Sequence, residues 1–218
     1  MNKYLNIITA TYPRPYRLHY LNHLKTLLCF QDHIRWFVID DNYNIDKELQ
    51  NFLPNFAIYK NIGPSKDKGH MQRNLALEYI YDNKLDGIIY NADDDNRYDI
   101  RIFEEIRKTK HFSMFPVGGD IKGVETKSER PIVDTKTKKF IKWDSVWGDR
   151  KYPMDMGGFA FNSILLQKLQ KPLWRHEGIG GESEFIDKII DSVDDIEFLC
   201  NDCTQTWVFH NALDFDRK

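Results

Sequence analysis

The chain has 218 residues, of which 41% are hydrophobic and 14% are aromatic, and its formal net charge is −2 at pH 7. This composition suffices for one α/β domain with a buried core, and the small net charge gives no electrostatic case for binding nucleic acid or an anionic membrane surface. Neither a secretory signal nor a transmembrane segment is evident, so we expect a cytoplasmic protein.

Short apolar runs alternate with helical patterns through the first half of the chain. β-branched and aromatic residues predict strands at residues 5–11, 34–39, 55–60 and 87–90. Apolar residues at three- and four-residue spacing predict helices at residues 17–30 and 69–81. This alternation is typical of the α/β class, with a doubly wound, mostly parallel sheet flanked by helices.

Three consecutive carboxylates, Asp93, Asp94 and Asp95, follow the fourth predicted strand. At ~4 Å and an effective dielectric constant of ~20, each pair of like charges costs about 4 kcal/mol, so a divalent cation is the expected counter-charge. Carboxylate oxygens are hard ligands, which favours Mg²⁺ or Mn²⁺ over Zn²⁺. The alternative is a solvated acidic turn before the next helix, with Asp99 as its N-cap.

Two more polar residues follow predicted strands, Tyr12 after the first and Asp41 after the second. The carboxyl ends of parallel strands meet at one edge of a sheet, where ligands of such folds bind. We therefore expect Tyr12, Asp41 and the three consecutive aspartates to outline one cleft.

The second half of the chain is less regular. It is predicted to contain a short helix after Asp99, a strand at 113–117, a hairpin with strands 131–133 and 140–143, a helix that opens at 178–184, and a last strand at 203–210. There is no repeat, low-complexity segment or linker, so residues 1–218 are predicted to form a single domain.

Three residues of this half are candidates for chemistry. Asp155 lies in an apolar, glycine-rich stretch, where a carboxylate must be paired or functional because its burial is costly. Glu182 opens a predicted helix, and on its own it fits favourable interaction with the helix dipole better than catalysis. His210 ends the last strand, a place where a lone histidine is more often a surface residue than a ligand.

The three cysteines form no disulfide framework, in keeping with a reducing cytoplasm. Cys200 and Cys203 form a CxxC pair. Without a second pair or histidines at ligand spacing, a zinc or redox role is disfavoured.

Taken together, eight motifs in order resemble the β-1,3-glucuronyltransferases of glycosyltransferase family 43. The motifs are ITATYPRP from residue 8, WFVIDD from 36, QRNLAL from 72, NADDDN from 91, ERP from 129, DMGGFA from 155, GES from 181 and VFH from 208. The resemblance implies a GT-A fold with a nucleotide-binding half at 1–98, an acceptor-binding half at 99–218 and a small acceptor-side β element.

The resemblance also implies roles for individual residues. Donor contacts would come from Tyr12, Asp41, Lys68, Arg73, Asp93, Asp94 and His210. Tyr12 would stack on uracil and Asp41 would hydrogen-bond it, while Asp95 would ligate Mn²⁺ or Mg²⁺. Glu129 and Asp155 would line the acceptor site, and Glu182 would be the catalytic base.

These roles describe an inverting transfer from a UDP-α-sugar to a glycan or lipid-linked glycan, which we interpret as a step in bacterial surface polysaccharide synthesis. Lys68 stands where the animal enzymes have Arg, and Ala212 stands where they have a second Arg. Lys keeps the charge but loses the planar fork, so glucose, galactose or xylose is at least as compatible a donor sugar as glucuronate. A homodimer is also compatible with the resemblance.

Two other functions remain open from the sequence. A nucleotidyltransferase that makes nucleotide-sugars would share the fold, but a glycine-rich loop is expected where this chain has Tyr12-Pro13-Arg14-Pro15. A non-catalytic nucleotide-sugar or glycan-binding module would keep the aspartates and would not need Glu182.

Overall fold

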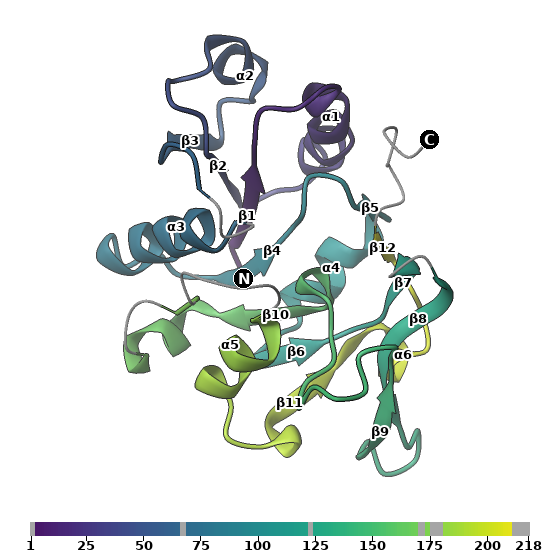
Figure 1. The fold of residues 1–218 in the computed structure, drawn as a ribbon. Coiled ribbons are helices and arrows are strands. Elements are labelled where there is room, and N and C mark those ends of the chain that lie inside the picture. Colours follow the sequence, from purple (N-terminus) through teal and green to yellow (C-terminus); the bar gives the residue numbers. More distant parts are fainter. Residues whose placement is uncertain (1–2, 66–68, 122–123, 170–172, 175–180, 211–218) are drawn as a thin grey trace.

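A seven-stranded, mostly parallel sheet forms the centre of the molecule (Figure 1). The computed structural model describes residues 3–65, 69–121, 124–169, 173–174 and 181–210. The strand order is β11 (Ile196–Phe198), β6 (Phe112–Met114), β10 (Phe159–Asn162), β4 (Ile88–Asn91), β1 (Leu5–Thr11), β2 (Ile34–Asp40) and β3 (Ala57–Asn61). Strands β1 to β4 are mutually parallel where they pair, whereas β10 runs antiparallel to β4 and β6. The predicted α/β class and the first four strands are confirmed.

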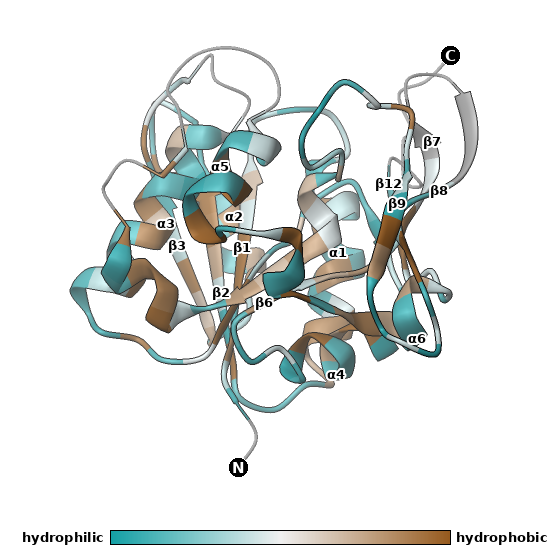
Figure 2. Cartoon of the chain, turned by 90° about the horizontal axis from the view of Figure 1, so that it is seen from below, coloured by the Kyte–Doolittle hydropathy of each residue, from teal (hydrophilic) through white to brown (hydrophobic). Residues whose placement is uncertain are grey.

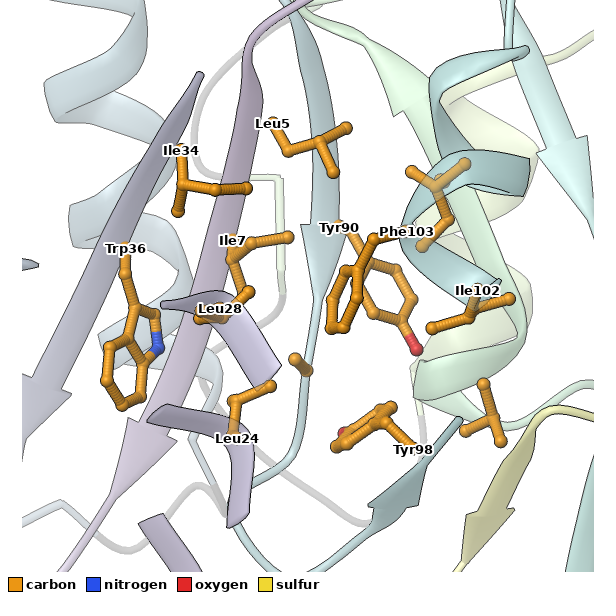
Figure 3. Packing of buried hydrophobic residues seen from close by; sticks show 14 of the residues in the cluster. Leu5, Ile7, Leu24, Leu28, Ile34, Trp36, Tyr90, Tyr98, Ile102 and Phe103 are labelled. Atoms are coloured by element: carbon orange, nitrogen blue, oxygen red, sulfur yellow. The ribbon is translucent and has the colours of Figure 1, made fainter. Parts of the chain in front are cut away.

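Helices cover both faces of this sheet. On one face lie α1 (Arg17–Leu28), α2 (Lys47–Phe52) and α4 (Arg101–Arg107), and on the other lie α3 (His70–Asp82) and α5 (Glu182–Ile189). Because strand side chains alternate, Ile7 packs in the first layer (Figure 3) and Ile8 in the second. Figure 2 shows the resulting distribution, with brown apolar strands inside and mostly teal outer loops.

A second, five-stranded sheet stands beside the first. Its order is β5 (Arg97–Tyr98), β12 (Val208–His210), β7 (Val117–Ile121), β8 (Val124–Val133) and β9 (Phe140–Asp144). Strands β8 and β9 form the predicted hairpin, with Val133 opposite Phe140. This sheet carries Glu129 on β8 and His210 at the end of β12, so it is the small β element that was predicted for the second half.

Two predicted strands were wrong in extent. Residues 113–117 were predicted as one strand, but the chain leaves β6 at Met114 and enters β7 in the other sheet at Val117. Pro116 lacks the N–H group that a continuous ladder needs, which explains the break.

The last strand was predicted to begin at Cys203 but begins at Val208. Residues Cys200 to Cys203, within α6 (Leu199–Cys203), have left-handed φ angles of 53° to 59°. Thr204 Oγ1 donates to the Asn201 carbonyl at 2.6 Å, a local bond that competes with strand pairing. Burial raises the pKa of the Cys203 thiol to about 12 and that of Cys200 further, so neither thiol is available as a thiolate.

The remaining elements are short. Three 3₁₀ turns, η1 (Met156–Gly158), η2 (Ser163–Lys168) and η3 (Val193–Asp195), connect the strands of the second half, and neither these turns nor α2, β5, β10, β11 and α6 were predicted. The central sheet contains strands from before and after residue 98. The division into a nucleotide-binding half at 1–98 and an acceptor-binding half at 99–218 stays a prediction. In the described part of the chain, no helix has the length and apolar character needed to cross a membrane.

Gly87, just before β4, offers a test of this packing. Its φ is +115°, and a Cβ atom there would lie 2.3 Å from the Tyr4 carbonyl oxygen. We expect Gly87→Ala to lower the free energy of unfolding by more than the roughly 1–2 kcal/mol cost of left-handed backbone alone. Thermal denaturation measures the effect, at roughly 2–4 °C per kcal/mol for a chain of this size.

Two other glycines are matched controls for this variant. Gly63 has a φ of +78° but open space around it, so Gly63→Ala reports the backbone cost alone. Gly148 has neither constraint, so Gly148→Ala should leave the melting temperature nearly unchanged. Equal melting of the Gly87 and Gly63 variants would contradict the close packing against Tyr4.

Candidate active site

A cavity of about 490 Å³ opens at the carboxyl ends of β1, β2 and β4. Its lining consists of Ala10, Thr11, Tyr12, Arg14, Asp41, Ser65, Gly69, Gln72, Arg73, Asp93, Asp94, Asp95 and His210. The cavity thus brings together all the residues predicted for the donor and metal sites except Lys68, which lies outside the described residues. The cleft predicted from the strand ends is confirmed.

Strand register explains why these residues meet. Thr11 lies opposite Asp40 in the parallel pair β1–β2, so Tyr12 and Asp41 leave the sheet side by side. The Asp41 N–H donates to the Thr11 carbonyl at 3.2 Å and continues this pairing. The neighbouring β4 pairs with β1 up to Asn91, which delivers the acidic triplet to the same edge.

The three adjacent aspartates do not share one environment. Arg73 Nη2 lies 2.6 Å from Asp93 Oδ1, and Arg14 Nη2 lies 2.6 Å from Asp94 Oδ1. Among the described residues, the arginine nearest to Asp95 is Arg14, with Nη1 3.7 Å away, and the Asp95 side chain is 31% exposed. Arginines therefore neutralise Asp93 and Asp94, and a divalent cation as the counter-charge for Asp95 stays a prediction.

The alternative of a solvated acidic turn does not fit this geometry. Asp99 Oδ1 accepts from the backbone N–H of Arg101 at 3.0 Å near the start of α4, although Ile100 occupies the N-cap position. The carboxylate of Asp94, however, is almost fully buried at the cavity. Its burial raises the pKa of Asp94 to about 7, and the Arg14 guanidinium opposes that rise.

Asp95 is the residue that fits a cation. Burial raises the pKa of Asp95, and repulsion from Asp93 adds to the rise, so a positive charge facing Asp95 would be stabilising. Among the described residues, no three His, Cys, Asp or Glu side chains are grouped as metal ligands. A lone carboxylate beside a cavity matches how Mg²⁺ and Mn²⁺ bind with substrate phosphates and water, and it does not match a structural zinc site.

The start of α3 is shaped around Arg73. Gly69 precedes the helix with a φ of +91°, and a Cβ atom there would lie 2.5 Å from Arg73 Nη1. Glycine therefore leaves room for a guanidinium that is nearly buried and points at the acidic loop.

Asp155 and His210 connect this cavity to the second sheet. His210 Nδ1 lies 3.2 Å from Asp155 Oδ2, and Asp155 Oδ1 accepts from the Gly157 N–H at 2.8 Å. Burial raises the pKa of Asp155 to about 6; His210 opposes the rise and Asp93 adds to it. Asp155, expected to be paired or functional, thus has a histidine beside it, and His210 lines the cavity, while the binding roles of both stay predictions.

Glu129 lies deeper than its predicted place in an acceptor site, because its side chain has no exposed surface. Ser145 Oγ donates to Oε1 at 3.2 Å, and within the described ranges Oε2 has no hydrogen-bond partner. Burial raises the pKa of Glu129 to about 7, and Asp155 adds to the rise. The raised pKa favours the protonated form of Glu129 compared with an exposed glutamate.

Glu182 is the first residue of α5, which Phe185 and Ile186 anchor in the core. Arg150 Nη1 lies 3.2 Å from Glu182 Oε2, and the Arg150 guanidinium also stacks on Trp147 at 4.3 Å. Glu182 thus has a specific partner in addition to the helix dipole.

Several site residues were missed by the sequence analysis: Thr11, Arg14, Ser65, Gln72 and Arg150. Thr11 and Arg14 lie on either side of Tyr12 in the motif ITATYPRP, and Gln72 begins the motif QRNLAL. Their place in these motifs was the available signal. Arg150 lies in a charged, irregular stretch and gave no such signal.

Known proteins similar to the chain agree with this geometry. A family model described as glycosyltransferase family 43 matches residues 23–214. The chain is 31% identical to galactosylgalactosylxylosylprotein 3-beta-glucuronosyltransferase P of Drosophila melanogaster, covering 94% of this chain and 45% of that protein. It is 28% identical to the probable beta-1,4-xylosyltransferase IRX9L of Oryza sativa, covering 98% of this chain and 52% of that protein. The chain therefore spans about half the length of these relatives.

A solved structure supports the fold independently. S. aureus TarS 1-349 superposes with a TM-score of 0.61 at 16% identity, covering 94% of this chain and 60% of that chain. The same protein has been solved in complex with UDP-GlcNAc. At this identity the likeness shows a shared fold, in agreement with the GT-A fold that was predicted.

The buried Glu129 predicts a pH-dependent stability difference. Its folded pKa of about 7 exceeds its ordinary value of 4.5, so between these values the folded chain holds a proton that the unfolded chain has lost. The contribution of this proton to the stability of the fold is full below pH 4.5 and is lost as pH rises through 7. We expect Glu129→Gln to melt progressively higher relative to the unmodified protein as pH rises from 5 to 8.

Melting temperatures of both proteins across this range measure the effect. Glu48→Gln removes an exposed carboxylate and should keep a constant difference at every pH. A constant difference for Glu129→Gln as well would show that Glu129 ionises normally.

Proposed function

The chain belongs to glycosyltransferase family 43, and we propose that it transfers a sugar from a UDP-α-sugar to a hydroxyl group of a glycan acceptor, with inversion at the anomeric carbon. One observation carries the proposal. Within the described part of the chain, Asp95 is the one aspartate of the acidic loop without a close arginine, and it lines the cavity at the strand ends next to an acidic cluster around Asp155. The names of the relatives support sugar transfer.

In this proposal the nucleotide occupies the cavity. Tyr12, which is 47% exposed, offers its ring to the uracil, and Asp41 accepts a hydrogen bond from it. Arg73 and His210 line the same cavity and would face the diphosphate. The UDP-GlcNAc complex of TarS supports a nucleotide-sugar in this type of fold.

Asp95 would hold Mn²⁺ or Mg²⁺, which supplies charge neutralisation for the departing diphosphate. Asp93 would bind ribose or donor sugar from its place on the same loop, with its charge balanced by Arg73. Asp94 lies against the nucleoside side but has both oxygens bonded within the protein, to Arg14 and Thr11.

Glu182 would act as the general base. The acceptor oxygen forms a bond to the anomeric carbon as the bond from that carbon to the β-phosphate oxygen breaks, and the acceptor proton passes to the Glu182 carboxylate. The products are a β-linked glycoside and UDP, with no covalent enzyme intermediate. Arg150 orients the carboxylate through Oε2.

The comparisons also bear on the alternatives. Relatives named as glucuronosyltransferases and as a xylosyltransferase leave both donor sugars as candidates, and they weigh against a nucleotidyltransferase. The cytoplasmic location, the homodimer, the lipid-linked acceptor and the role in surface polysaccharide synthesis stay predictions.

UDP binding tests the donor half of the proposal. With MnCl₂ present, saturating UDP should raise the melting temperature, by roughly 5–10 °C at a hundredfold excess over Kd. Asp95→Asn should abolish the part of the shift that depends on Mn²⁺, because it removes the carboxylate proposed to bind the cation. Asp86→Asn, at an exposed aspartate paired with Arg35, is the control and should retain the full shift. No shift with UDP in the unmodified protein would reject the donor assignment.

Glu182→Gln tests the catalytic half. We expect transfer to fall by about 10²–10⁴ in kcat, since the amide cannot accept the proton, while UDP binding stays unchanged. Glu184→Gln removes an exposed carboxylate from the same helical turn and should retain activity. Full activity of Glu182→Gln in a transfer assay would exclude its role as base. No turnover in the unmodified protein, with UDP binding intact, would instead favour a non-catalytic binding module.

A further inference from the structure

Arg14 occupies the space between two tyrosine rings. Its Cζ atom lies 4.6 Å from the ring centroid of Tyr12 and 4.5 Å from that of Tyr20, which is buried on α1. The Arg14 side chain is only 11% exposed, and prolines precede and follow it in the chain. A planar guanidinium can contact two aromatic rings in this way and still bond through its edges, whereas a lysine ammonium cannot.

The edges of the same guanidinium are also bonded. Nη1 donates to the Tyr12 hydroxyl at 2.9 Å, and Nη2 donates to Asp94 Oδ1 at 2.6 Å. Thr11 Oγ1 donates to the other oxygen of Asp94 at 2.7 Å. The end of β1 at Thr11 and the loop that follows it are thereby joined to the acidic loop. Arg14 and Asp94 are 80 positions apart in the chain.

This arrangement determines how Tyr12 faces the cavity. One face of its ring is covered by Arg14, and its hydroxyl is fixed by the same side chain. The ring is still 47% exposed and lines the cavity, so its uncovered face is the one open to a ligand.

We propose that Arg14 is a positioning residue that fixes the Tyr12 ring and the Asp94 carboxylate as one preformed platform for the nucleoside part of the nucleotide. The inference rests on the proposed function and adds to it a residue to which no role in binding has been given. Arg14 acts through Tyr12 and Asp94, so its loss weakens the nucleoside contact and leaves the contact with the diphosphate unchanged.

Calorimetric titration with UMP and with UDP, in MnCl₂, separates these contacts. We expect Arg14→Lys to weaken both ligands by the same factor, about tenfold, because the charge stays while the stacking and the two-edged bonding are lost. In a transfer assay the KM for the donor should rise by a similar factor with a much smaller change in kcat.

Tyr12→Phe gives a second test that leaves the ring in place. It removes only the hydroxyl that accepts from Arg14, so a Tyr12 that served simply as a stacking surface would lose nothing. We expect a loss of about threefold to tenfold in UMP affinity, and no additional loss when Tyr12→Phe is combined with Arg14→Lys.

Arg107→Lys is the control for loss of a buried arginine. Arg107 is 7% exposed at its side chain and donates to the carbonyls of Lys3 and Asp32, away from the cavity. We expect it to lower the melting temperature without changing UMP affinity.

Two outcomes would overturn the inference: unchanged UMP affinity in Arg14→Lys, or a larger loss for UDP than for UMP, which would make Arg14 a direct diphosphate contact. Absence of UMP and UDP binding in the unmodified protein would instead reject the proposed function. The ratio of the UMP affinity of each variant to that of the unmodified protein tests the positioning role alone.

Discussion

The site depends on how three adjacent carboxylates at the end of β4 are neutralised. Unpaired, each close pair would cost about 4 kcal/mol at an effective dielectric constant of ~20. Arg73 from α3 balances Asp93, and Arg14 from the loop after β1 balances Asp94. Among the described residues, the least balanced charge of the loop is thereby on Asp95, which lines the cavity together with Asp93 and Asp94. The difference between the three aspartates therefore comes from selective pairing with arginines and not from the number of acidic residues.

Glu129 on β8 and Asp155 just before η1 have a different environment. Glu129 is buried and the Asp155 side chain is 15% exposed, and burial raises their pKa values to about 7 and about 6. Both therefore hold protons for part of the time near neutral pH, which lowers the negative charge around the proposed base. Glu182 instead forms an ion pair with Arg150 at 3.2 Å, which holds its carboxylate group in place.

Sequence alone predicted the elements whose signal is local. The β-branched runs placed β1 to β4, and the residues after them met at one edge because parallel strands require it. Arg14 escaped this reasoning because its partner Asp94 is 80 residues away, and an arginine between two prolines suggests an exposed loop. Glu182 and Asp155 were given site roles through motif resemblance, and those roles stay predictions; their contacts with Arg150 and His210 depend on packing between elements that no periodicity encodes.

Packing between elements also connects the proposed nucleotide-binding part of the site to the proposed base. Asn74, adjacent to Arg73 on α3, donates to the carbonyl of Trp174 and accepts from its N–H, both at 2.9 Å. The Trp174 ring in turn stacks on Phe185 of α5, with centroids 4.0 Å apart and planes 5° from parallel. The helix that carries Arg73, the proposed diphosphate contact, is thus joined through buried groups to the helix that begins with the proposed base. Their relative placement follows from the core, so it is established before any ligand binds.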